Sequence, residues 1–165
     1  MDGEPGALID ALRQTLNAEL PITRHLGVRV VQGALDRVIL AAPLAENKNH
    51  MGTAFGGSLN AVATLAAWAW FWVFLEERCL PAEVVVQDST IRFNRPVTTD
   101  FRASCAAPAP ATISHFLEVY RRAGRGRLTL HVDISDHLGV AAAFSGRFVA
   151  VKTGAAPDAA TTSWE

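Results

Sequence analysis

The feature that most constrains this fold is an apolar run without a single charge, residues 59–75. Its large aromatic residues are Trp68, Trp70, Phe71, Trp72 and Phe74. A helix that is apolar on all sides has to be buried, either in a protein core or in a bilayer. The run is at the short limit for spanning a bilayer, and Asn60 and Thr64 interrupt its start. We therefore predict a long helix buried in the core, and no contact with a membrane.

The stretch before this run, residues 47–58, is polar and rich in glycine. Its polar side chains are mainly those of Asn47, Asn49, His50, Thr53 and Ser58. Gly56 and Gly57 are expected to leave the first backbone N–H groups of the helix unscreened by side chains. Those donors and the positive end of the helix dipole suit an oxyanion or a polarised carbonyl. We expect any active site to lie here.

The length of 165 residues predicts one domain with a sizeable core. Hydrophobic residues make up 50% of the chain and the formal net charge is -1, which argues against both a disordered chain and a nucleic-acid partner. No basic segment follows Met1, so no secretory signal is evident and we expect a cytoplasmic protein.

The residue types that could bind a metal or form disulfides, cysteine and histidine, are few and scattered along the sequence. Cys79 and Cys105 cannot form a disulfide framework, and we expect both thiols to be reduced and buried. The histidines outside the polar loop have no metal-ligand spacing, and we infer no metal site. These histidines are His25, His115, His131 and His137.

The periodicity of the remaining chain predicts an α+β fold. A helix over residues 5–20 precedes a β-hairpin formed by residues 28–33 and 37–42, and the long helix ends near Glu77. A short helix capped by Thr112 is expected between Pro110 and Tyr120. Further strands are predicted at residues 84–96, 101–105, 128–134 and 140–151. An antiparallel sheet wrapped around the long central helix would bury that helix and the apolar face of each strand.

The helix start Asn49-x-x-Gly52-x-x-Phe55-Gly56-Gly57 resembles that of the hotdog fold. Hotdog thioesterases of the phenylacetate type carry Asn-x-x-Gly-x-x-His-Gly-Gly, so Phe55 stands at their histidine position. The longer string over residues 47–58 looks more like the YiiD C-terminal domain family. That family was named for thioesterase activity and includes proteins of fatty acid metabolism that decarboxylate malonyl-ACP. The resemblance covers residues 8–152; it implies one hotdog domain over residues 1–152, and we expect residues 153–165 to form a disordered tail.

The sequence departs from hotdog thioesterases at the general base. Those enzymes usually place Asp or Glu on the central helix, where this chain has Thr64, and no acidic residue lies between Glu46 and Glu76. Hydrolysis needs an activated water or a nucleophile, whereas decarboxylation needs only a polarised thioester carbonyl and benefits from an apolar wall. The missing acid favours decarboxylation of malonyl-ACP. Thioester hydrolysis and non-catalytic binding of acyl thioesters stay open.

The resemblance also implies roles for the residues of the helix start. Asn49 and the N–H of Gly57 are the principal candidates for holding the thioester oxygen. Asn47 and His50 are further catalytic candidates. The alternative for Asn47 is that it merely braces the loop, and the alternative for His50 is that it is an ordinary surface residue. The substrate-binding candidates are Thr53, Phe55, Gly56, Ser58 and Thr64. Thr53 and Ser58 could serve first as helix caps, and Thr64 could bond a carbonyl of the preceding turn.

A basic run follows the predicted short helix and consists of Arg121, Arg122, Arg125 and Arg127. It is either a solvated turn at a helix C-terminus or a dock for the phosphate of coenzyme A or for acidic acyl carrier protein. The phosphopantetheine thioester would enter as part of the substrate, so no separate cofactor is expected. Since an open sheet leaves an edge strand, we predict a homodimer or a dimer of dimers, with the site between protomers.

Overall fold

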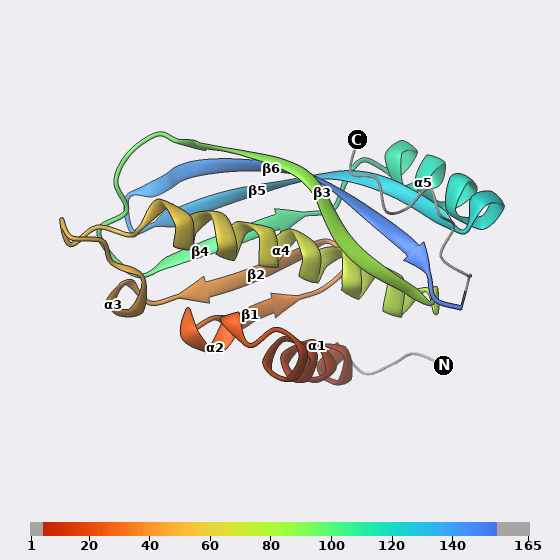
Figure 1. Cartoon of the computed structure of the whole chain (residues 1–165), viewed down its shortest axis with the longest axis horizontal. Coiled ribbons are helices and arrows are strands. Elements are labelled where there is room, and N and C mark those ends of the chain that lie inside the picture. The colour runs from red at the N-terminus through yellow and green to blue at the C-terminus, as the bar shows by residue number, and fades with distance from the viewer. Residues whose placement is uncertain (1–4, 155–165) are drawn as a thin grey trace.

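The computed structural model describes residues 5–154 (Figure 1). A six-stranded antiparallel sheet, in the order β1-β2-β4-β5-β6-β3, curves around the long helix α4. The elements are α1 (Pro5–Glu19), α2 (Ile22–His25), β1 (Arg29–Gly33), β2 (Arg37–Ala42), α3 (Leu44–Asn47), α4 (Gly56–Glu77), β3 (Ala82–Phe93), β4 (Phe101–Ala106), α5 (Pro110–Ala123), β5 (Arg125–Asp136) and β6 (Gly139–Lys152). The predicted α+β class, with a sheet wrapped around a central helix, is confirmed.

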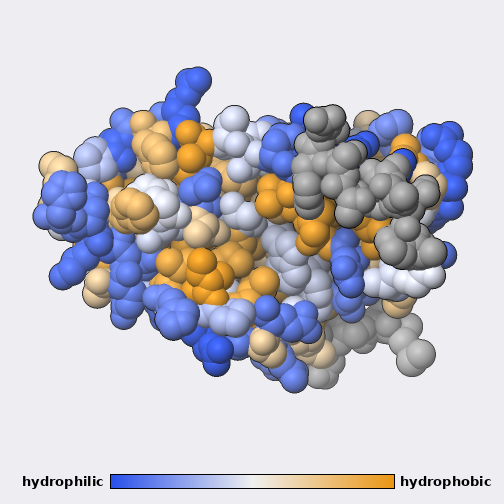
Figure 2. All heavy atoms as spheres, viewed as in Figure 1, coloured by the Kyte–Doolittle hydropathy of each residue, from blue (hydrophilic) through white to orange (hydrophobic). Residues whose placement is uncertain are grey.

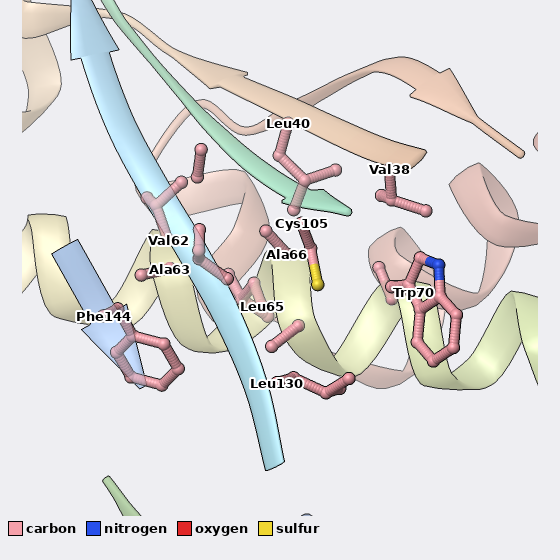
Figure 3. Close-up of a cluster of buried hydrophobic side chains, with 14 of the residues drawn as sticks. Val38, Leu40, Val62, Ala63, Leu65, Ala66, Trp70, Cys105, Leu130 and Phe144 are labelled. Atoms are coloured by element: carbon pink, nitrogen blue, oxygen red, sulfur yellow. The ribbon is translucent and has the colours of Figure 1, made fainter. Parts of the chain in front are cut away.

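The core lies between the inner face of the sheet and α4. Figure 3 shows Leu40, Leu130 and Phe144 on three different strands with their side chains directed at this helix. Alternate residues of each strand face the core, which gives β5 its strict alternation of exposed and buried positions. The buried indole of Trp70 donates its N–H to the carbonyl oxygen of Leu35 at 3.0 Å, so its polar atom is satisfied.

One stripe of α4 is only half buried, which the uniform apolarity of this helix did not predict. The stripe consists of Asn60, Ala61, Thr64, Trp68 and Trp72. The indole N–H of Trp68 donates to the carbonyl oxygen of Val84 at 3.1 Å and so ties the stripe to β3. Figure 2, viewed as in Figure 1 with α4 toward the reader, shows hydrophobic surface in the middle of this face of the molecule. Most of α4 is nevertheless buried, as expected for a core helix with the length and composition of a membrane span.

β3 forms one edge of the sheet and pairs only with β6. Most of its residues are exposed, including three large hydrophobic ones. These are Val85, Val86 and Phe93, whose exposed fractions are 43%, 37% and 50%. A long exposed edge strand is a ready template for pairing with another chain.

Three of the predicted element boundaries are wrong, the first being the end of β3, which lies at Phe93 and not at residue 96. α5 begins at Pro110, whose missing N–H suits the first helical position, so Thr112 lies inside the first turn and does not cap it. β5 begins at Arg125, earlier than expected, because the buried Gly126 has no side chain to mark the alternation. Arg125 and Arg127 therefore lie in a strand and not in a turn. The short helices α2 and α3 were not predicted.

The two cysteines differ in exposure. Cys105 is buried as expected, and burial raises the pKa of its thiol to about 12. Cys79 is exposed just beyond the end of α4, so the prediction that it is buried is wrong. The predicted disordered tail falls, apart from its first two residues, on residues 155–165, outside the described part of the chain.

Candidate active site

The loop between α3 and α4 folds back on itself as a tight hairpin. The N–H of Asn49 donates to the carbonyl oxygen of Thr53 at 2.7 Å, and the N–H of Gly52 donates to that of Asn49 at 3.1 Å. Gly52 has a φ of +78°, a left-handed conformation that glycine adopts without strain. The N–H of Ala54 donates to the carbonyl oxygen of Val97 at 2.8 Å, which fastens the hairpin to the connection after β3.

The side chain of Asn49 holds this hairpin together. Its Oδ1 accepts the N–H of Met51 at 2.9 Å and that of Thr53 at 3.2 Å. Its Nδ2 donates to Oγ1 of Thr53 at 2.9 Å. A carboxamide has two N–H donors, and the second one of Asn49 has no acceptor among residues 5–154. Asn49 is half buried and can therefore offer one N–H to a ligand while it keeps the hairpin in place.

Asn47 is buried, with an exposed fraction of 2%. Its Nδ2 donates to the carbonyl oxygens of Leu26 at 2.8 Å and Pro43 at 2.7 Å, which uses both of its N–H donors. Its backbone carbonyl oxygen accepts the N–H of Phe55 at 2.7 Å, whereas its buried Oδ1 has no hydrogen-bond partner among the described residues. Asn47 thus has no free donor for a substrate, and of the two predicted roles the bracing one fits its contacts.

The start of α4 carries unpaired backbone donors. No side chain caps this helix, so the predicted capping roles of Thr53 and Ser58 are wrong. Within the described chain, the N–H groups of Gly56, Gly57 and Ser58 have no hydrogen-bond acceptor. These groups and the helix dipole together favour a negative charge or a polarised oxygen at this end of α4.

Two aromatic rings lie against the glycines at this start. The ring of Phe55 lies against Gly57, where a Cβ atom would overlap it. The ring of Phe93 lies against Gly56, where a Cβ atom would come within 3.3 Å. The two rings are 56% and 50% exposed, respectively. Glycine at both positions lets apolar walls approach the free N–H groups. Apolar surroundings strengthen the interaction of these groups with a negatively charged ligand atom.

A pocket of about 380 Å³ opens beside the start of α4. It is lined by Thr53, Ala54, Gly56, Leu59, Phe93, Asn94, Arg95, Pro96 and Val97. No Asp, Glu or His is among these residues. The pocket thus offers apolar surface next to neutral donors, and no general base. The sequence pattern singled out Thr53 and Gly56 but missed residues 93–97, because they are distant in sequence and carry no motif.

Arg95 is the one charged group on the wall of this pocket, and its charge is paired. Its guanidinium makes two bonds to the carboxylate of Asp136, at 3.0 and 2.6 Å. The hydrogen bonds from Arg95 hold the pKa of Asp136 well below its usual range, although burial acts in the opposite direction. The same hydrogen bonding raises the pKa of Arg95. The pair therefore stays ionised and presents little net charge to the pocket.

Of the predicted site residues around the helix start, only Thr53 and Gly56 line the pocket. Those that do not line it are Asn47, Asn49, His50, Phe55, Gly57, Ser58 and Thr64. His50 is exposed in the turn of the hairpin. Thr64 lies about 10 Å along α4 from Gly57, at 1.5 Å per residue, on the same half-exposed stripe of the helix. Its Oγ1 donates to the carbonyl oxygen of Asn60 at 2.9 Å, which is the alternative role predicted for it, a bond to a carbonyl of the preceding turn.

The four arginines are far from this pocket in the same chain. Arg121 and Arg122 are in the last turn of α5, and Arg125 and Arg127 are exposed on β5. β5 runs from these arginines to Asp136, roughly 36 Å away at about 3.3 Å per residue. In Figure 1, α3 and α5 accordingly lie at opposite ends of the sheet. We call them the loop end and the arginine end.

A larger hollow of about 500 Å³ lies on the outer face of the sheet. Thr129, His131 and Asp133 line it, and they alternate with β5 residues that face the core. It has no connection to the start of α4. In residues 5–154, no three His, Cys, Asp or Glu side chains are grouped as metal ligands would be.

The wrapped sheet, the central helix and the donor-rich start of that helix define a hotdog protein of the class that acts on acyl thioesters. The family model described as "Putative thioesterase (yiiD_Cterm)" matches residues 9–152. The chain therefore belongs to this family, YiiD_C, as its helix start indicated.

Solved structures share this fold. A protein of unknown function from Chlorobaculum tepidum TLS is 28% identical, with a TM-score of 0.85 over 90% of this chain and 97% of that one. A "putative thioesterase from Shewanella oneidensis" is 25% identical, with a TM-score of 0.77 over 88% of this chain and 98% of that one. A thioesterase from Haemophilus influenzae, 15% identical, has a TM-score of 0.70 over 91% and 94% of the two chains and shows the fold alone.

Proposed function

We propose that this enzyme decarboxylates the malonyl thioester of acyl carrier protein to the acetyl thioester. The observation that carries the proposal is the pocket at the start of α4, which joins free N–H donors to apolar walls and has no Asp, Glu or His in its lining. Neutral donors suit an oxygen that gains charge only in the transition state. A hydrolase would instead need a base beside the thioester.

The reaction needs only neutral donors beside the pocket. The thioester carbonyl accepts hydrogen bonds from the N–H of Gly57, which follows the pocket-lining Gly56, and from the second N–H of Asn49 in the hairpin. The bond between the carboxylate and the neighbouring carbon then breaks, CO₂ leaves, and the electron pair moves onto the carbonyl oxygen as an enolate. The carbon finally takes a proton from water or from His50, and the acetyl thioester leaves with its thioester bond intact.

The apolar rings at the helix start favour the step that loses CO₂. Phe55 and Phe93 flank the two glycines, so a malonyl carboxylate held there would be poorly solvated. Poor solvation raises the free energy of the carboxylate, whereas the enolate oxygen is stabilised by the N–H donors. Phe55 at the histidine position of other hotdog enzymes is consistent with this chemistry.

Hydrolysis of an acyl thioester is the second candidate. The family description and the name of the Shewanella oneidensis protein favour it. A base would have to come from another subunit, because the pocket of this chain supplies none. A non-catalytic protein that binds acyl thioesters is the third candidate.

One incubation separates the three candidates. The protein is incubated with malonyl-ACP, malonyl-CoA and a series of acyl-CoA thioesters, and the products are resolved by mass spectrometry. Acetyl thioester without free thiol supports decarboxylation, and free thiol supports hydrolysis. Binding without turnover would leave only the third candidate.

We also propose that two chains pair through β3. This strand is the sheet edge and exposes Val86 and Phe93 on its inner side, so a second copy would cover both its free backbone groups and its apolar residues. Two-fold pairing of antiparallel edges would place the arginine end of one chain near the loop end of its partner. A stable, fully active monomer in sedimentation would contradict this arrangement.

A further inference from the structure

The most heavily bonded charged group in the described chain is the carboxylate of Asp136, whose side chain is fully buried. It accepts two hydrogen bonds from Arg95, one from the N–H of Leu138 at 2.9 Å and a long one from the N–H of Thr98 at 3.5 Å. Arg95 also donates to the carbonyl oxygen of Gly139 at 2.6 Å. The pair thus joins the connection after β3 to the turn between β5 and β6.

This junction continues to the start of α4 without a break. Val97, two residues after Arg95, is fully buried, and its carbonyl oxygen accepts the N–H of Ala54. Ala54 directly precedes Phe55 and Gly56, where the free N–H donors begin. Arg95, Val97, Ala54 and Gly56 also line the same pocket. Any movement of the Arg95–Asp136 pair would therefore be passed to the donors.

We propose that Arg95 and Asp136 are positioning residues, which set the place of the α4 N–H donors through Val97 and Ala54. The inference rests on the proposed function for its effect on turnover. A buried ion pair adds little net stability because desolvation of the two charges is costly. It does fix a geometry, and catalytic groups are sensitive to geometry: a displacement of about 1 Å can cost roughly 10²-fold in rate.

The test uses Asp136→Asn and Arg95→Lys, each of which breaks the two-pronged bond and keeps a polar side chain of similar size. The matched control is Asp10→Asn, which breaks the exposed pair between Asp10 and Arg13, 2.9 Å apart on α1. Hydrogen exchange is followed at the Ala54 N–H and, for reference, at the Val28 N–H, which donates to the carbonyl oxygen of Thr23. Turnover and KM are measured with malonyl-ACP.

Both variants of the Arg95–Asp136 pair should speed exchange at the Ala54 N–H by at least tenfold and leave the exchange rate of the Val28 N–H within twofold of the wild type. Turnover should fall by about 10- to 100-fold, with KM changing less. The control should change neither quantity. Unchanged exchange at Ala54 in both variants, or an equal rise at Val28, would overturn the proposal. If the wild type turns over no thioester, the proposed function fails, and exchange at Ala54 alone decides this inference. If Asp136→Asn does not fold, Arg95→Lys decides it.

Discussion

The loop end and the arginine end of the sheet hold their charges in opposite ways. At the loop end, Arg95 and Asp136 form a partly buried pair in which the carboxylate is fully bonded. At the arginine end, four arginines are exposed, and within residues 5–154 none of them makes an ion pair. A buried, bonded charge fixes a structure, whereas exposed like charges act over a distance on a mobile partner. The first end is therefore suited to chemistry and the second to docking.

The largest expected effect breaks the loop end itself. Asn49→Ala should lower turnover by roughly 10²–10³, the usual cost of one oxyanion donor. Asn49→Asp should be at least as damaging, because it places an anion where the enolate oxygen develops. Steady-state rates with malonyl-ACP provide the measurement.

Since Asn49 also bonds Thr53, the loss has to be separated from a disturbed hairpin. Thr53→Val removes that bond and leaves the amide in place, so it should cost much less. Thr64→Ala should matter little, since decarboxylation requires no base on α4. Loss of activity in Thr64→Ala with retention in Asn49→Ala would favour a hydrolytic site along the helix.

A smaller effect is expected at the arginine end. Removing two charges, in Arg125→Gln with Arg127→Gln, should raise KM for an ACP substrate by roughly tenfold and weaken its salt dependence. A short carrier-free thioester should be affected much less. Arg29→Gln, an exposed arginine on β1, is the control and should change neither. An equal loss on both substrates would mean that the arginines are structural.

Mixed dimers would then test whether the two ends meet across subunits. Chains carrying Asn49→Ala are paired with chains carrying Arg125→Gln and Arg127→Gln. If the arginines of one chain serve the loop of its partner, each mixed dimer contains one complete site and exceeds both parents at low substrate concentration. If each chain serves itself, mixing restores nothing.

The difference between the two ends was only partly predictable from sequence. Local patterns indicated the hairpin, α4 and its glycine-rich start, because periodicity and turn residues act over a few positions. The Arg95–Asp136 pair joins residues forty-one positions apart and has no local pattern. The separation of the arginines from the pocket was also not predictable, since it depends on the course of β5 through the sheet. The roles of Asn47 and Asn49 separated only once burial and contacts were known.

The pH dependence of stability sharpens the description of the loop end. The pKa of Asp136 is lowered in the folded state, so its stabilisation is complete above the unfolded-chain pKa of about 3.9 and is lost as the pH falls below it. The melting temperature of the wild type should exceed that of Asp136→Asn at pH 7, and the gap should close in acid. The other titratable group facing Asp136 is His137, whose Nδ1 is 4.0 Å from the carboxylate. The His137→Gln variant should therefore still lose melting temperature in acid as the wild type does. A gap that does not narrow between pH 5 and pH 2 would contradict the assignment.

The smallest effect concerns how α4 ends near the arginine end. The N–H groups of Cys79 and Leu80 bond the carbonyl oxygens of Glu76 and Leu75, both at 2.9 Å, which is the Schellman arrangement. Glycine usually occupies the position of Cys79, because its φ of +52° costs an L-residue about 1–2 kcal/mol. Part of this cost is offset by the greater freedom of glycine in the unfolded chain.

Cys79→Gly should therefore stabilise the protein by up to about 1 kcal/mol, measured as a higher urea midpoint with an unchanged slope. Cys79→Ala removes the thiol but keeps the left-handed conformation, so its midpoint should stay close to that of the wild type. The converse change, Gly124→Ala at the end of α5, places a side chain at a φ of +67° and should destabilise. If Cys79→Gly and Cys79→Ala shift the midpoint equally, the thiol and not the backbone governs this turn.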